Sequence, residues 1–167
     1  ATPKTMEWIE KLKQESKKNG TVGCVVLDKQ GNLTAGTSTG GMFKKRWGRI
    51  GDSPVIGAGT YADNNSCAVS CTGHGEYFIR HAVAFDVCAR YKYLKESVEK
   101  AADYIIHTEL NTNAGNGGLI AVDKLGNIAM PYNSGGMFRG FLYKEKGSPE
   151  IKKGCGIGKK IVVVGEK

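Results

Sequence analysis

Short apolar runs separated by turn residues dominate the first quarter of the chain after its lysine-rich start. Residues 21–27 form one such run, the turn sequence DKQGN follows at 28–32, and a second run continues to Thr39 before Gly40 and Gly41. Runs of this length that are bounded by Asp, Asn and Gly are typical of β-strands joined by tight turns. The pattern therefore predicts a β-hairpin over residues 21–39.

The same pattern recurs 95 residues further along the chain. Residues 118–138 repeat residues 23–43, and nine of the 23 positions from Thr21 to Phe43 are identical between the two copies. Two copies are too few for a solenoid. We therefore predict that the two related hairpins pair at the centre of one antiparallel sheet.

Helical patterning lies between the two hairpins. Residues 55–60 and 67–72 have the pattern of short strands, whereas 76–93 and 96–110 carry broad apolar faces at helical spacing. The order of strands, two helices and further strands predicts an α+β fold with the helices segregated from the sheet. We also expect a short helix within residues 2–18 and an edge strand at 161–164.

Composition excludes several classes of protein. The chain has 167 residues, of which 40% are hydrophobic, and its net charge of +8 comes from 24 Lys+Arg against 16 Asp+Glu. This length and composition suit one folded domain with its own core. No apolar run reaches the roughly 18 residues of a membrane helix, so we expect no membrane partner. The lysine clusters at 11–18 and 152–160 are interpreted as solvated surface, whereas the cluster at 44–49 lies among residues that suggest chemistry. We expect no nucleic-acid partner.

Five cysteines and three histidines are scattered without metal-site spacing. No CxxC pair occurs, and five is an odd number of cysteines. This pattern argues against a disulfide scaffold and against a zinc site. We expect reduced thiols, a cytoplasmic protein, no metal and no cofactor.

Threonines at glycine-bounded positions are the main candidates for chemistry. A threonine hydroxyl is a poor nucleophile unless a base lies beside it, and an N-terminal threonine carries such a base in its own α-amino group. Thr21 would gain this group only if the bond between Gly20 and Thr21 were cleaved. The alternative is that Thr21 is an ordinary β-branched residue at the start of a strand.

Two further stretches carry polar groups suited to binding a substrate. Arg49 offers a planar fork for a carboxylate, and Asp52 offers a carboxylate for an ammonium group, so the pair would suit an amino-acid zwitterion. Thr72 and Gly73 supply a hydroxyl and a backbone N–H that suit an oxyanion hole. The alternatives are a surface salt bridge in the first stretch and an ordinary strand-to-helix turn in the second.

Five motifs in close order carry a family resemblance. They are TVG at 21–23, TSTGGM at 37–42, GRIGDSP at 48–54, GAGTYA at 57–62 and TGHGE at 72–76. Together they resemble the catalytic β-subunit of the plant-type L-asparaginase and isoaspartyl peptidase family, which are N-terminal-nucleophile hydrolases of the threonine type. The resemblance covers residues 19–141.

The resemblance implies a role for each motif residue. Thr21 would be the nucleophile in cleavage of the Gly20–Thr21 bond and in substrate hydrolysis, and Thr39 would orient it. Arg49 would bind the α-carboxylate of the substrate, while Asp52 and the carbonyl of Gly75 would bind its α-amino group. Thr72 and Gly73 would form the oxyanion hole.

The resemblance also implies a subunit organisation. Residues 1–20 would be the C-terminal end of an α-subunit, and residues 21–167 the catalytic β-subunit with an unassigned tail from about 151. The family fold is a four-layer αββα sandwich that an α-subunit completes, assembled as a dimer of αβ units. With residues 1–20 attached, the chain would be inactive until cleaved.

Three hypotheses of function are compatible with the sequence. The first is hydrolysis of the β-amide of asparagine and of β-aspartyl dipeptides, which release aspartate. The second is glycosylasparaginase activity on sugar-linked asparagine, although Asn19-Gly20 replaces the Asp that usually precedes the threonine in that branch. The third is a non-catalytic basic module that binds nucleic acid.

Overall fold

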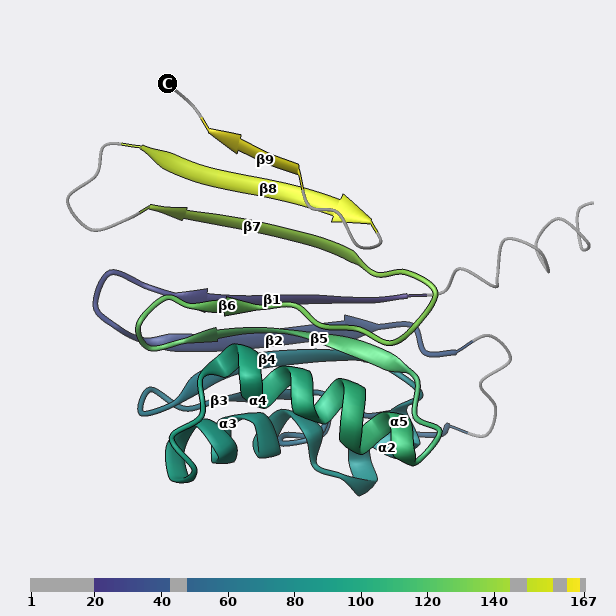
Figure 1. Cartoon of the computed structure of the whole chain (residues 1–167). Coiled ribbons are helices and arrows are strands. Elements are labelled where there is room, and N and C mark those ends of the chain that lie inside the picture. Colours follow the sequence, from purple (N-terminus) through teal and green to yellow (C-terminus); the bar gives the residue numbers. More distant parts are fainter. Residues whose placement is uncertain (1–19, 43–47, 145–149, 158–161, 166–167) are drawn as a thin grey trace, which may run out of the picture.

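A computed structural model describes residues 20–42, 48–144, 150–157 and 162–165, and it contains three antiparallel sheets and one helical layer (Figure 1). The predicted helix within residues 2–18 lies outside these ranges. The mixed α and β character and the order of strands, helices and strands agree with the prediction. Among the described helices, none has both the length and the apolar run needed to cross a bilayer.

The first sheet is the predicted hairpin. Strands β1 (Thr21–Leu27) and β2 (Leu33–Thr39) pair in antiparallel register, with Thr21 opposite Thr39. The Asp28 carboxylate accepts hydrogen bonds from the backbone N–H groups of Gln30 and Asn32, and Gly31 has a φ of 88°. The turn therefore uses the residues on which the sequence prediction rested.

The second sheet contains the repeat of this hairpin. Its strand order is β3-β4-β5-β6, and its members are β3 (Thr60–Ala62), β4 (Cys67–Gly73), β5 (Gly117–Asp123) and β6 (Ile128–Ala129). In the second turn the Asp123 carboxylate accepts from the N–H groups of Leu125 and Asn127. The second hairpin is confirmed, with a short return strand before Pro131.

The predicted pairing of the two hairpins is wrong. They belong to different sheets, and the β1–β2 hairpin packs against the face of β4 and β5 instead of pairing with the second hairpin in one sheet. The reason is burial: residues 67–71 of β4 are all buried, so both faces of this strand need cover. The hairpin has one half-buried face, with every second residue turned inward, and it supplies that cover.

Residues 55–60 do not form the predicted strand. They make turns in which the carbonyl of Asp52 accepts hydrogen bonds from the N–H groups of Val55 and Gly59. Only Thr60 belongs to a named strand, β3. The bends bring residues 52–59 close to the end of β4, where the Gly59 carbonyl accepts from the Cys71 N–H.

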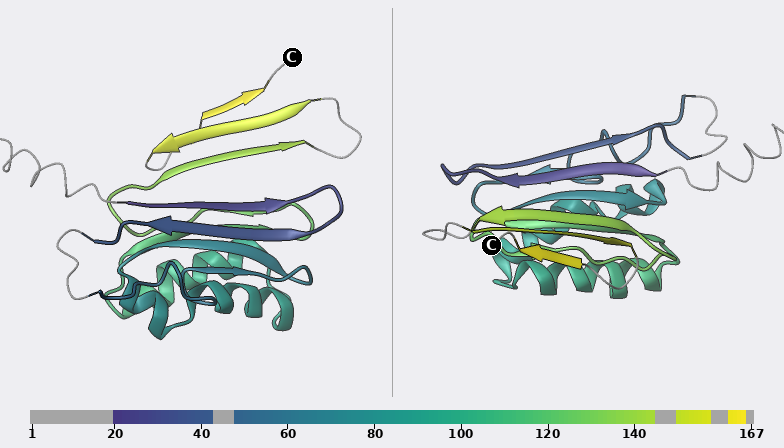
Figure 2. Two further views of the ribbon diagram at one scale, coloured as in Figure 1. Left: turned by 180° about the vertical axis from the view of Figure 1, so that it is seen from behind. Right: turned by 90° about the horizontal axis from the view of Figure 1, so that it is seen from above.

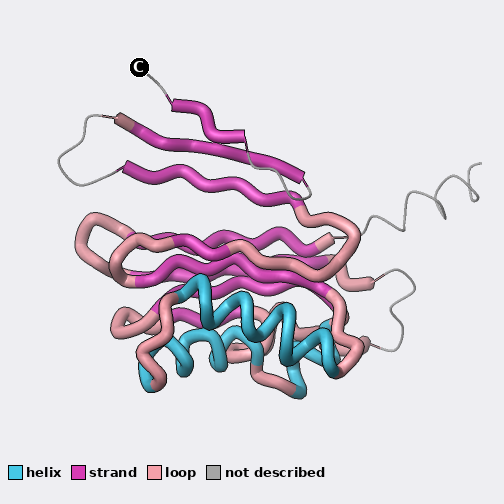
Figure 3. Tube along the Cα trace, viewed as in Figure 1, coloured by secondary structure: helices cyan, strands magenta, loops and turns pink. Residues whose placement is uncertain are grey.

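The helices cover the other face of the second sheet (Figures 1 and 3). They are α2 (Gly75–Arg80), α3 (Val83–Tyr93), α4 (Val98–Tyr104), the π-helical turn η2 (Ile105–Glu109) and α5 (Leu110–Thr112). The predicted single helix over 76–93 is broken at Ala82, whose φ of 45° is left-handed. The predicted second helix starts at Ser97, whose hydroxyl accepts from the Lys100 N–H.

A third sheet follows the second hairpin. Its strands are β7 (Phe138–Lys144), β8 (Ile151–Ile157) and β9 (Val162–Gly165), in the order β7-β8-β9. Figure 2 shows this sheet beyond the β1–β2 hairpin, away from the helices. The predicted edge strand near 161–164 is confirmed as β9, while β8 lies in the tail that had no assignment.

The main core lies between β4, β5 and the helices. Phe78 of α2 is fully buried in it, beside Cys71 and Leu119 of the sheet. The Phe78 ring also fills the space that side chains at Gly73 and Gly117 would occupy. This helix side chain therefore packs against the end of β4 where the site residues lie.

Replacing Phe78 tests this packing. We expect Phe78→Ala to lower the free energy of unfolding by about 3–5 kcal/mol, because removing the buried ring leaves a cavity in the core. Denaturant unfolding measures the loss. Phe85→Ala is the matched control, since Phe85 is 43% exposed, and it should cost less than half as much. Equal losses would contradict this account of the core.

Candidate functional site

Alternation along β4 directs its residues to two different sides of the sheet. Cys67, Val69 and Cys71 pack in the core against the helices. Ala68 packs in a second cluster with Val25 of the hairpin. Because successive side chains of a strand point to opposite faces, Ser70 and Thr72 also face the hairpin.

Close contacts fix the hairpin over Ser70. The Thr37 hydroxyl lies 2.6 Å from the Ser70 hydroxyl and donates to the Gly59 carbonyl at 3.1 Å. Gly23, the register partner of Thr37, has the Ser70 side chain where a Cβ would stand. Only glycine fits at position 23, and this explains why the TVG motif ends in glycine.

Three threonines lie at the same end of the stacked sheets. Each is two residues along its strand from a residue of the contact just described. Thr21 and Thr39 face each other in the register of β1 and β2, both are half-buried, and both point inward as Gly23 and Thr37 do. Thr72 stands two residues beyond Ser70 on β4. The fold thus places three of the predicted site residues at one end of the space between the two sheets.

Thr39 and Gly20 complete the surroundings of Thr21. The Thr39 Oγ1 accepts a hydrogen bond from the Gly41 N–H at 3.0 Å, so the hydroxyl proton of Thr39 can be donated elsewhere. Gly20 precedes β1 and is exposed. The peptide bond between Gly20 and Thr21 therefore lies at the surface, at the edge of this group.

Gly73 ends β4 in a backbone conformation that favours glycine. Its φ is 154°, and a Cβ here would collide with the Asn116 carbonyl and the Phe78 ring. Gly117 is the register partner of Gly73, and a Cβ there would collide with the Thr72 carbonyl and the Phe78 ring. The two glycines let the chain turn from β4 into α2 with backbone groups close to Thr72.

Asp52 places a buried carboxylate beside this turn. It is 6% exposed, and its Oδ2 has no hydrogen-bond partner among the described residues. Its Oδ1 lies 2.7 Å from where a Cβ of residue 75 would stand, so there is no room for a side chain at this position and glycine is required. Burial raises the pKa of Asp52, and the nearby Arg49 offsets part of that rise. An ammonium group is the natural partner for such an oxygen.

Arg49 lies at the same turn but pairs with a residue that the sequence did not single out. Its Nη2 is 2.9 Å from Oε2 of Glu76, in the first turn of α2, and both side chains are partly exposed. The Arg49–Asp52 salt bridge considered from sequence is therefore replaced by Arg49–Glu76. The only signal for Glu76 was its place in the TGHGE motif.

The sequence did not single out Ser70 either, although its hydroxyl contact with Thr37 connects the hairpin to β4.

The predicted site residues all lie around the end of β4 that leads into α2. They are Thr21, Thr39, Thr72, Gly73, Asp52, Gly75 and Arg49. Within the ranges described, no three His, Cys, Asp or Glu side chains form a group suited to a metal ion.

Comparison with known proteins decides the family. The family model for asparaginase matches residues 2–151, which is most of the chain. The chain belongs to the asparaginase family. The five motifs that carried the resemblance lie within the matched residues.

Relatives within this family are similar over about three quarters or more of the chain. It is 54% identical over 129 residues to the isoaspartyl peptidase of Salmonella typhimurium, and 49% identical over 143 residues to that of Escherichia coli K12. It is 44% identical over 148 residues to the isoaspartyl peptidase/L-asparaginase of Mus musculus. These matches cover 77%, 80% and 81% of the chain but 41%, 44% and 44% of the relatives, so the chain spans less than half their length.

Proposed function

We propose that this chain carries the nucleophile and the substrate-binding groups of an amidohydrolase. Its substrates are the β-amide of L-asparagine and the β-aspartyl bond of isoaspartyl dipeptides, and aspartate is released from both. The observation that carries the proposal is the placement of Thr21, Thr39 and Thr72 at one end of the space between the two sheets, with the buried carboxylate of Asp52 against Gly75 in the turn that follows β4. The names of the relatives support the same substrates.

Cleavage before Thr21 prepares the nucleophile. The Thr21 hydroxyl attacks the carbonyl of Gly20, the acyl group shifts from nitrogen to oxygen, and water hydrolyses the ester. The exposure of Gly20 supports this step, since the bond lies at the surface. The product is a free α-amino group on Thr21, whose ordinary pKa is near 8 and which acts as the base.

Substrate hydrolysis then uses the same hydroxyl. The Thr21 amine takes the hydroxyl proton as Oγ1 attacks the β-carbonyl of the substrate, and it returns the proton to the leaving amine. Thr39 orients the nucleophile, and Thr72 with the Gly73 N–H stabilises the oxyanion. Water hydrolyses the resulting β-aspartyl ester of Thr21.

Two charged residues and a carbonyl select an aspartyl group. Arg49 binds the α-carboxylate of the substrate with its planar fork. Asp52 and the Gly75 carbonyl bind the α-amino group, and the unpartnered Oδ2 of Asp52 supports this assignment. Both substrate classes present the same aspartyl part to these groups.

The subunit organisation belongs to the same proposal. Residues 1–20 form the end of an α-subunit and residues 21–167 form the β-subunit. The α-subunit covers the outer face of the β1–β2 hairpin and completes a four-layer αββα sandwich, and two αβ units dimerise. Val22, 69% exposed on that outer face, supports the need for cover. We place the protein in the cytoplasm because its described cysteines are free thiols.

Glu76 tests whether Arg49 binds the substrate. We expect Glu76→Gln to raise KM for asparagine about two- to fivefold with kcat unchanged, because Arg49 loses its charged partner while an exposed ion pair is worth little. Steady-state kinetics measure this effect, with the exposed Glu99→Gln of α4 as the matched control. An unchanged KM would contradict it, and a lower KM would show that Glu76 competes with the substrate carboxylate for Arg49 and does not position Arg49 for it.

A comparison of activity on three substrates tests the function as a whole. The cleaved full-length protein should release aspartate from asparagine and from β-aspartyl-leucine. Preference for N-acetylglucosaminyl-asparagine would identify a glycosylasparaginase instead. Absence of all three activities, together with steeply salt-dependent retention on heparin, would favour the nucleic-acid module.

A further inference from the structure

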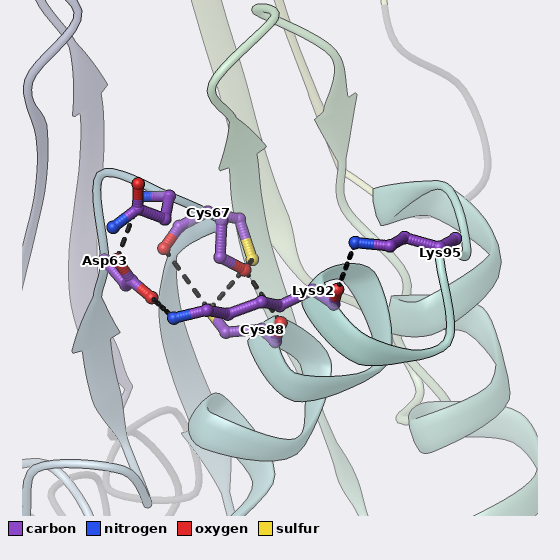
Figure 4. Close-up of polar contacts among 7 residues, drawn as sticks. Asp63, Cys67, Cys88, Lys92 and Lys95 are labelled. Atoms are coloured by element: carbon purple, nitrogen blue, oxygen red, sulfur yellow. Dashed lines mark hydrogen bonds and ion pairs between the residues drawn. The ribbon is translucent and has the colours of Figure 1, made fainter.

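Two cysteine thiols meet in the core on the helix side of β4. Cys67 begins β4 and Cys88 lies on α3, and their Sγ atoms are 2.8 Å apart. Their exposed fractions are 0% and 2%. Figure 4 shows the pair between the strand and the helix. The proposed hydrolysis uses neither thiol.

This separation is close to what a covalent bond requires. A disulfide holds its sulfur atoms at about 2.0 Å, so the Cys67 and Cys88 sulfurs would need to approach by less than about 1 Å. Cys71 is equally buried on the same face of β4, but the contact joins Cys67 to Cys88.

The surroundings give the two thiols different roles. A hydrogen bond from Cys88 lowers the pKa of Cys67, and the same hydrogen bond raises the pKa of Cys88. The Cys88 Sγ also lies 3.2 Å from the Cys67 carbonyl oxygen, so its one proton can point to that oxygen or to the Cys67 Sγ, and the Ser66 hydroxyl lies 3.5 Å from the Cys67 Sγ. Cys67 is therefore the thiol that ionises first, with Cys88 in contact as the second thiol.

We propose that Cys67 and Cys88 form an oxidation site, at which hydrogen peroxide converts the two thiols into an intramolecular disulfide. The Cys67 thiolate attacks one peroxide oxygen, the O–O bond breaks, and the released hydroxide takes up a proton to become water. Cys67 is then a sulfenic acid. The Cys88 sulfur attacks the Cys67 sulfur, the S–S bond forms, the S–O bond breaks, and the leaving hydroxide departs as water with the Cys88 proton. In total the thiols lose two electrons and two protons, and peroxide is reduced to two waters.

Burial selects the oxidant. Peroxide is small enough to enter during local opening of α3, whereas a bulky disulfide such as oxidised glutathione cannot form a mixed disulfide in a packed core. The exposed Cys24 and Cys155 take up glutathione instead. The bond closes a loop between positions 21 residues apart, which restricts the unfolded chain and raises the unfolding temperature.

Peptide mapping tests the site directly. The full-length protein carrying Cys24→Ser and Cys155→Ser is treated with hydrogen peroxide, alkylated with iodoacetamide after denaturation, and digested without reductant. Mass spectrometry should find a peptide joining residues 67 and 88, two hydrogens lighter than its parts and separated by dithiothreitol. Cys71, the matched control, should be alkylated. The unfolding temperature should rise by about 5 °C or more on oxidation.

Two results would overturn the site. One is that Cys67 and Cys88 are both fully alkylated at a peroxide dose that oxidises Cys24 in the unsubstituted protein. The other is their separate oxidation to sulfinic or sulfonic acids without a joined peptide. The Cys88→Ser variant should trap Cys67 as a sulfenic acid that dimedone labels, while Cys67→Ser should leave Cys88 unlabelled. Equal labelling of both would contradict the assigned roles. If either variant fails to fold, the peptide map still decides.

Discussion

Thr21→Ala is expected to abolish hydrolysis of asparagine and of β-aspartyl dipeptides. The substitution removes the hydroxyl that attacks the substrate, and it also prevents the cleavage that would free the α-amino base. Loss of a covalent nucleophile typically costs about 10³-fold or more in kcat. Aspartate release measured over hours should therefore fall to the level of a sample without enzyme.

Two substitutions serve as controls for Thr21. Thr21→Ser keeps a hydroxyl at the same backbone position and should keep part of the activity. Thr34→Ala makes the same change as Thr21→Ala at an exposed position of the same hairpin and should leave activity intact. Full activity of Thr21→Ala would remove the threonine from the mechanism.

Asp52→Asn has the second largest expected effect. We expect kcat/KM for asparagine to fall about a hundredfold or more, because a buried ammonium–carboxylate contact is lost while the ammonium still has to be desolvated. Succinamate, which is asparagine without its α-amino group, should be hydrolysed equally by the variant and by the unsubstituted protein. An equal loss on both substrates would show that Asp52 acts on something other than the amine.

The pH dependence of kcat/KM provides an independent test of Asp52. Burial raises its pKa above the ordinary value of 3.8, because the charged form is disfavoured in the core. The carboxyl therefore stays protonated to a higher pH than usual and can bind an ammonium only above that pKa. The free Thr21 amine must also be deprotonated, so kcat/KM falls below its pKa near 8 in every variant, and Asp52 adds a second, steeper fall at a lower pH that is still above the pKa of an ordinary aspartate. Asp52→Asn should lack the steeper fall, and an equally steep acid side in the variant would contradict the role.

Local patterns were sufficient to predict the two hairpins and their turns. Asp28 and its repeat Asp123 organise their turns within four residues, so a short stretch of sequence contains the whole interaction. The way the hairpins combine was not predictable in this way. It depends on β4 being buried on both faces, which involves residues far apart in the chain. The helix break at Ala82 was missed because a left-handed alanine has no sequence signal.

The candidate site shows the same division. The motifs led to Thr21, Thr39 and Thr72, and the stacking of the two sheets explains why residues so distant in sequence lie at one end. Glu76 was missed because its partner Arg49 is 27 residues away and the contact forms only when α2 packs beside the loop. The Cys67–Cys88 contact was missed for the same reason, since neither cysteine belongs to a recognisable pair motif.

Intact mass spectrometry of the full-length protein over time tests the central claim most directly. The account predicts that the precursor disappears as two chains accumulate, one of which begins at Thr21, and that aspartate release rises in step with this chain. In Thr21→Ala the precursor should persist. An uncleaved protein that hydrolyses asparagine as fast as the cleaved one would contradict the account.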